Sequence, residues 1–106
     1  MKRVAITNGT GIWFDSEKAE KFEEKTYWNG NNHISKATGS QWEHESIFLT
    51  KGGAFVLSHW SQFQGSVDTC EIISKEEASK WFAKQEFSDD ELPKDLLGDV
   101  YGLELL

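Results

Sequence analysis

The three histidines have the clearest capacity for chemistry in this sequence: His33, His44 and His59. His44 stands between Glu43 and Glu45, and imidazole and carboxylate groups are the ligands of open catalytic zinc sites. The spacings match neither HxxxH nor HExxH, the patterns that place two histidines on one helical face. We therefore expect neither a metal nor another cofactor, and a metal-dependent hydrolase is only the third functional hypothesis.

Nucleophilic catalysis has less support. Cys70 is next to acids, which raise the pKa of a thiol, and no cation or helix start activates it. Ser58 precedes His59 within an expected strand, where neighbouring side chains point to opposite faces and cannot pair as nucleophile and base. The glycines follow no phosphate-loop spacing and are typical of turns.

Aromatic and amide side chains concentrate in the same part of the chain as the histidines. Flat apolar rings beside hydrogen-bonding groups suit a protein partner, a sugar or a flipped base. The same tryptophans can instead form the core of a small domain, and we expect this of Trp60 and Trp81. Trp28, Trp42 and at most Trp13 should be exposed. The candidate binding residues here are Trp28, Asn31, Asn32, His33, Gln41, Trp42 and Glu43.

Charge is distributed unevenly along the chain. Residues 1–85 carry a net charge of −1 and residues 86–106 a net charge of −6, so nearly all the acidity is C-terminal. Arg3 is the only arginine, and clustered cations are needed for phosphate affinity, so direct nucleic-acid binding is not expected. An acidic end is commonly solubilising, but it also suits a basic protein surface. Three of its acids complete the set of candidate binding residues: Asp89, Asp90 and Glu91.

A chain of 106 residues with 14 aromatic side chains is the size of one domain and can form one core. We expect a compact domain over residues 1–87 and an acidic extension over residues 88–106. The apolar end of that extension could dock on the domain, add as an edge strand or meet a partner. The first residues form no signal peptide, no apolar run is long enough for a bilayer, and a lone cysteine closes no disulfide, which together predict a cytoplasmic protein without membrane contact.

The N-terminal part of the sequence predicts short elements. Residues 3–14 are expected to form a hairpin that turns at residues 8–11. Asp15 or Ser16 can cap a helix extending to Thr26, and a strand ending at Tyr27-Trp28 competes with that helix. Residues 29–41 have the composition of a long irregular loop that can contain a short hairpin at Asn29-Gly30.

The clearest strand signal is a hairpin of residues 46–50 and 54–60. Pairing across Gly52-Gly53 places Ile47 and Leu49 on one face with Val56 and Trp60, and Phe48, Phe55, Leu57 and His59 on the other. A turn at Lys51-Gly52 would instead place His44 opposite His59. Both faces are apolar in the first pairing, which predicts a central hairpin covered on two sides.

A third strand is expected at residues 67–73, followed by the most clearly marked helix. Ser74 and Glu77 form a capping box, and the helix should extend to about Glu86. A further helical turn is predicted at residues 93–97, stopped at Gly98. The fold class is therefore α+β, an antiparallel sheet of about four or five strands packed by this helix, with N-terminal elements or the tail on its other face. Ala78, Trp81, Phe82 and Gln85 follow helical spacing, and the stripe of Ala78, Trp81 and Phe82 should pack on one face of the sheet.

Three segments, residues 29–35, 38–45 and 60–66, resemble a small family of bacterial proteins carried on plasmids and phages. The similarity covers residues 3–87 and transfers no catalytic residue. It implies a mobile-element setting, in which small acidic proteins often inhibit host defence, as anti-CRISPR and anti-restriction proteins do.

The leading hypothesis is thus a small non-enzymatic protein that binds a macromolecular partner, a protein with a basic surface. The second is a small-ligand or carbohydrate module that uses Trp28 and Trp42.

Overall fold

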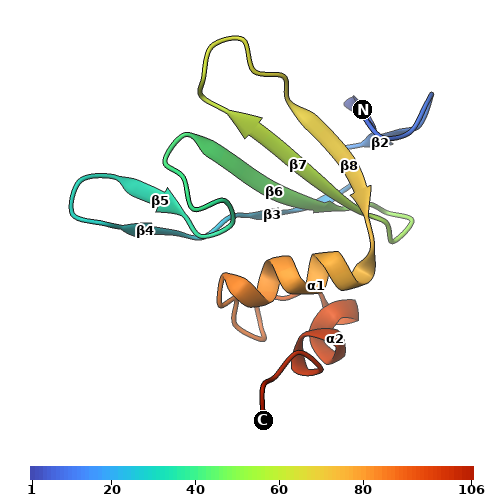
Figure 1. Ribbon diagram of the computed structural model, residues 1–106. Helices are drawn as coiled ribbons and strands as arrows, with labels where there is room; N and C mark the ends of the chain where they lie inside the picture. Colours follow the sequence, from blue (N-terminus) through green and yellow to red (C-terminus); the bar gives the residue numbers. More distant parts are fainter.

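The computed structural model describes residues 1–106 and confirms the α+β class in a single domain. A four-stranded antiparallel sheet has the order β3-β6-β7-β8, and two short ribbons, β1-β2 and β4-β5, lie outside it (Figure 1). No helix is long and apolar enough to cross a bilayer. The elements are β1 (Arg3–Ala5), β2 (Trp13–Asp15), β3 (Glu20–Glu23), β4 (Thr26–Trp28), β5 (His33–Ser35), β6 (Glu43–Leu49), β7 (Phe55–Ser61), β8 (Thr69–Ile73), α1 (Lys75–Lys84), η1 (Lys94–Leu96) and α2 (Leu97–Tyr101).

The central hairpin forms, but in neither of the predicted registers. Leu49 pairs with Phe55 and His44 with Trp60, one residue away from each predicted pairing. Both predictions assumed a two-residue turn, whereas the connection has three residues, 51–53. It is closed by the Thr50 N–H to Ala54 carbonyl bond of 2.9 Å, and Gly53 supplies the left-handed residue with φ 91°.

This register reassigns the faces of the sheet. Ile47 and Leu49 share the helix side with Phe55 and Leu57, not with Val56 and Trp60 as predicted. Phe48, Val56 and Trp60 point to the other side, because strand neighbours alternate.

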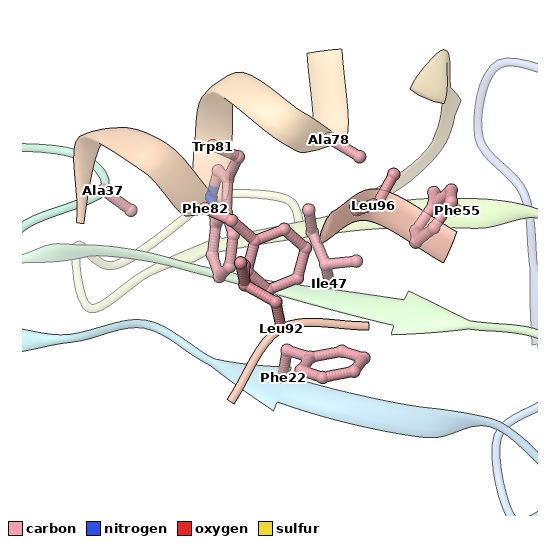
Figure 2. Packing of buried hydrophobic residues seen from close by; sticks show 9 residues of the cluster. All are labelled: Phe22, Ala37, Ile47, Phe55, Ala78, Trp81, Phe82, Leu92 and Leu96. Atoms are coloured by element: carbon pink, nitrogen blue, oxygen red, sulfur yellow. The ribbon is translucent and has the colours of Figure 1, made fainter. Parts of the chain in front are cut away.

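Helix α1 is confirmed with its capping box, in which Ser74 Oγ accepts the Glu77 N–H at 3.0 Å. The predicted stripe of Ala78, Trp81 and Phe82 is buried, and so is Gln85, which follows it on the helix. Phe82 contacts Phe22 of β3 edge to face, with ring centroids 5.2 Å apart (Figure 2). The main core lies between this helix and the sheet.

The other face of the sheet is covered by N-terminal elements, as predicted. Val4 of β1 pairs with Phe14 of β2, and Ile6 and Phe14 pack on Val56. The loop of this ribbon also forms hydrogen bonds with backbone groups on the outer edge of β8. Thr7 N–H donates to the Cys70 carbonyl at 2.7 Å, and the Asn8 side-chain amide bonds both the N–H and the carbonyl of Ile72.

The predicted helix from Asp15 or Ser16 to Thr26 is wrong. Its place is taken by β3 and β4, and the competing strand that ends at Trp28 is confirmed. A helix would have grouped Ala19, Phe22 and Thr26, but β3 buries Phe22 alone by pairing it with Ile47 of β6. Within residues 29–41, the short hairpin predicted at Asn29-Gly30 forms between β4 and β5.

The C-terminal segment differs in length from its prediction. The turn starting at Lys94 continues through Gly98 as α2 and ends at Gly102. Leu97 and Val100 of α2 pack against the main core, which explains why the helix continues past Gly98. Leu92 and Leu96 are themselves part of that core, although they lie in the segment that the sequence sets apart as an extension. Beyond α2 the chain neither docks on the sheet nor adds a strand, and Leu105 and Leu106 are fully exposed.

Helix α1 ends in a Schellman motif built on a non-glycine residue. Glu86 has φ 61°, its N–H donates to the Ala83 carbonyl, and the Phe87 N–H donates to the Phe82 carbonyl. The rings of Phe82 and Phe87 pack edge to face at 4.9 Å, which supplies the apolar contact of the motif. Glutamate at this position therefore carries left-handed backbone strain that glycine would not.

Replacing Glu86 by glycine should raise the free energy of unfolding by about 0.5–1 kcal/mol, because relief of this strain exceeds the entropy cost of glycine. Urea denaturation followed by circular dichroism measures the change. Glu76→Gly, within the first turn of the same helix, should lower stability by a similar amount. Equal losses in both variants would contradict the strain at Glu86.

Candidate binding surface

Exposed aromatic side chains gather at one end of the sheet. At this end β3 runs into β4, β6 begins and β7 ends, so the β4–β5 hairpin and the β7–β8 loop both project from it (Figure 1). We call this region the aromatic end and define it by four residues. They are Trp28, His33, Trp42 and Phe63.

The tip of the β4–β5 hairpin unites four of the predicted binding residues. Asn29 Oδ1 accepts the N–H groups of Asn31 and Asn32 at 2.9 and 2.8 Å, which fixes the turn. Trp28 and His33 pair across the strands with ring centroids 5.1 Å apart. Since 59% of Trp28 is exposed, its ring stands open to a partner.

The second aromatic pair joins the start of β6 to the β7–β8 loop. Trp42 and Phe63 have ring centroids 5.7 Å apart, and the Gln62 N–H donates to the Trp42 carbonyl at 2.9 Å. The two rings are 45% and 58% exposed, respectively. Sequence reasoning missed Phe63, although a phenylalanine flanked by Gln62 and Gln64 outside any strand pattern was a usable signal. The predicted residues Gln41 and Glu43 flank Trp42.

A buried carboxylate joins the β4–β5 hairpin to β6. Glu24 follows β3, and its side chain is only 8% exposed. One oxygen accepts the Ser35 hydroxyl at 2.8 Å and the Glu45 N–H at 2.7 Å, while the other contacts His44 Nδ1 at 2.7 Å. Glu24 therefore connects the hairpin, through Ser35, to β6 just after Trp42. Buried carboxylates with several donors have well-defined geometry.

The three histidines have separate partners. His33 contacts Trp28, His44 stacks on Trp60 with centroids 5.7 Å apart, and His59 Nε2 lies 3.8 Å from Glu43 Oε1. The proposed pairing of His44 with His59 is wrong, because the three-residue turn places Trp60 opposite His44. No group of three His, Cys, Asp or Glu side chains is arranged to hold a metal ion.

The three acids of the candidate set are engaged within the fold. Asp89 accepts the Tyr101 hydroxyl, Asp90 accepts the Ser88 hydroxyl, and Glu91 pairs with Lys25. The hydrogen bond from Lys25 holds the pKa of Glu91 at about 2. Other acids of this region have no ion-pair partner, namely Glu86, Asp95 and Glu104.

Exposure of four of the five tryptophans follows the prediction: Trp13, Trp28 and Trp42 are exposed and Trp81 is buried. Trp60 was predicted in the core but is only half-buried, beneath its contact with His44. Four hollows mark the surface, and none is lined by Trp28, Trp42 or Phe63. The aromatic end is thus a raised surface, not a pocket.

Comparisons with protein-family models, with curated proteins and with solved structures found no match to this chain.

Replacing Glu24 by alanine should lower the free energy of unfolding by about 2–3 kcal/mol, because the Ser35 hydroxyl and the Glu45 N–H lose a buried acceptor. Glu24→Gln keeps one oxygen for these two donors and should cost less than half as much. Thermal denaturation of the two variants measures the difference. Equal stability of Glu24→Ala and the unmodified protein would show that the carboxylate does not anchor this end.

Proposed function

We propose that the protein acts by binding a protein partner through the aromatic end. The supporting observation is the exposure of two separate aromatic pairs on one end of a folded domain. Large rings are normally buried, and exposed tryptophans are enriched at the centres of protein interfaces. Each pair is held by backbone hydrogen bonds around it, so little conformational entropy is lost on binding.

The shape of the surface favours a macromolecule over a small ligand. Small-molecule sites are concave and enclose most of their ligand, whereas Trp28 and Trp42 line no hollow. A projecting hairpin and a neighbouring ring pair can instead insert into depressions of a larger partner. The amides of Asn31, Asn32 and Gln41 would supply hydrogen bonds around the rings.

Charge supports a basic partner. The C-terminal region carries unpaired acids at Glu86, Asp95 and Glu104. Such charges accelerate encounter with a basic protein and disfavour acidic competitors. A host defence protein, whose nucleic-acid groove is basic, is the class we would test first, because of the resemblance to plasmid- and phage-borne proteins.

The triple variant Trp28→Ala/Trp42→Ala/Phe63→Ala should lose the partner that the unmodified protein recovers from host lysate. Truncating central aromatic residues typically costs more than about 2 kcal/mol each, so the affinity should fall at least ~100-fold. Quantitative pull-down, followed by calorimetry with the purified partner, measures the loss.

A matched control is available at the opposite end of the sheet. Trp13 is 45% exposed, the same fraction as Trp42, and Trp13→Ala should retain the partner. All variants should keep the circular dichroism of the unmodified protein. Loss of binding in Trp13→Ala alone would move the interface away from the aromatic end.

Neutralising the unpaired acids in Glu86→Gln/Asp95→Asn/Glu104→Gln should slow association and reduce its dependence on salt, because screening acts on exposed charges. The matched control, Glu20→Gln/Asp68→Asn/Glu71→Gln, removes the same charge from β3, from β8 and from the residue that precedes β8. Association rates between about 50 and 300 mM salt distinguish the two sets. Equal salt dependence of both would reject a specific role for the C-terminal acids.

A further inference from the structure

A second feature of the surface lies at the end of the sheet opposite the aromatic end. A hollow of about 290 Å³ lies between the β1–β2 ribbon, the turn from Thr50 to Ala54, and strands β7 and β8. Its lining residues come from four parts of the chain that are separate in sequence and meet only in the fold. Its apolar wall comprises Ile6, Ile12, Trp13, Phe14, Val56 and Ile72.

The apolar wall is partly open to solvent. Ile12 is 50% exposed and Trp13 is 45% exposed, while Val56 beneath them is buried. Apolar surface of this kind, concave and lined by large side chains, is typical of small-molecule sites. The volume is at the lower end of the range for such sites, which suits a ligand of the size of one ring with a short side chain.

The rim of the hollow is basic. Lys18 and Lys51 line it, and neither forms an ion pair within the chain. The Arg3 guanidinium lies 4.5 Å from the centre of the Trp13 ring and adds a third cation nearby. These cations lie beside an apolar site. The protein as a whole has a net charge of −7, so this part of the surface differs in sign from the rest.

Asp15 is the acid of this site. Its Oδ1 accepts the N–H groups of Lys2 and Glu17, both at 3.1 Å. The hydrogen bond from the Lys2 N–H is the main cause that lowers the pKa of Asp15, so the carboxylate is ionised at neutral pH. The two backbone donors stabilise part of its negative charge within the fold. The two lysines exceed this single negative charge, and the site has a net positive character.

We propose that this hollow binds a small amphipathic acid, with its apolar body against Trp13, Val56 and Ile72 and its carboxylate between Lys18 and Lys51. Burial of the apolar body supplies affinity, and the two ammonium groups select for a negative head. The site is independent of the partner proposed above, because it uses the other end of the sheet.

Three probes of equal size test this binding: 3-phenylpropionate, 3-phenylpropanol and 3-phenylpropylamine. In two-dimensional ¹H–¹⁵N NMR titrations, 3-phenylpropionate should shift the signals of Ile12, Gly52 and Ile72. It should bind about five- to tenfold more tightly than the alcohol, which corresponds to about 1 kcal/mol for two partly exposed ion pairs. The amine should bind most weakly.

Two variants and a control sharpen the test. Lys18→Gln/Lys51→Gln should remove the preference for the acid and leave the affinity for the alcohol unchanged. The control Lys36→Gln/Lys94→Gln replaces two lysines elsewhere that form no ion pair, and it should leave the affinities for all three probes unchanged. Ala54→Leu, which fills the hollow from an exposed position, should weaken all three probes. Equal affinity of acid and amine, or shifts outside this hollow at millimolar probe, would overturn the proposal.

Discussion

The three-residue turn between β6 and β7 is the constraint on which the rest of the structure depends. Gly53 in its left-handed conformation and the Thr50–Ala54 hydrogen bond fix one register for the hairpin. A slip of one residue would exchange the two faces of one strand relative to the other. In the observed register Ile47 and Leu57 point together to helix α1, while Phe48 and Val56 point to the N-terminal ribbon. Two separate cores on one thin sheet follow from this single turn.

The register also decides what the histidines can do. Placing His44 opposite Trp60 allows the two rings to stack and directs Nδ1 to Glu24. The imidazole therefore belongs to a polar anchor that holds the β4–β5 hairpin, not to a metal centre. Under the binding function proposed above, the exposed rings near this anchor would contact the partner, and His44 would support them from within the fold.

Local signals in the sequence predicted the elements that depend on local contacts. Helix α1 was predictable because Ser74 and Glu77 cap it and its buried stripe has helical spacing. The exposure of Trp28 and Trp42 was predictable because the residues around them are polar. The β3 strand was not, since Phe22 is its only buried residue and its strand state depends on pairing with β6, which is distant in sequence. The role of Glu24 was equally hidden, because its partners Ser35, His44 and Glu45 meet only after the sheet has formed.

The bonds from Thr7 and Asn8 to β8 have a consequence for how the molecule avoids association with itself. These residues lie 63 and 64 positions from the strand that they cover, so their contacts close one of the longest loops in the chain. Closing a loop of this length costs chain entropy, which disfavours early formation of such contacts. Wherever the ribbon is not docked, β8 presents an open row of backbone groups that can pair with another chain. The N-terminal ribbon therefore protects the edge of the sheet, although none of its residues belongs to the main core.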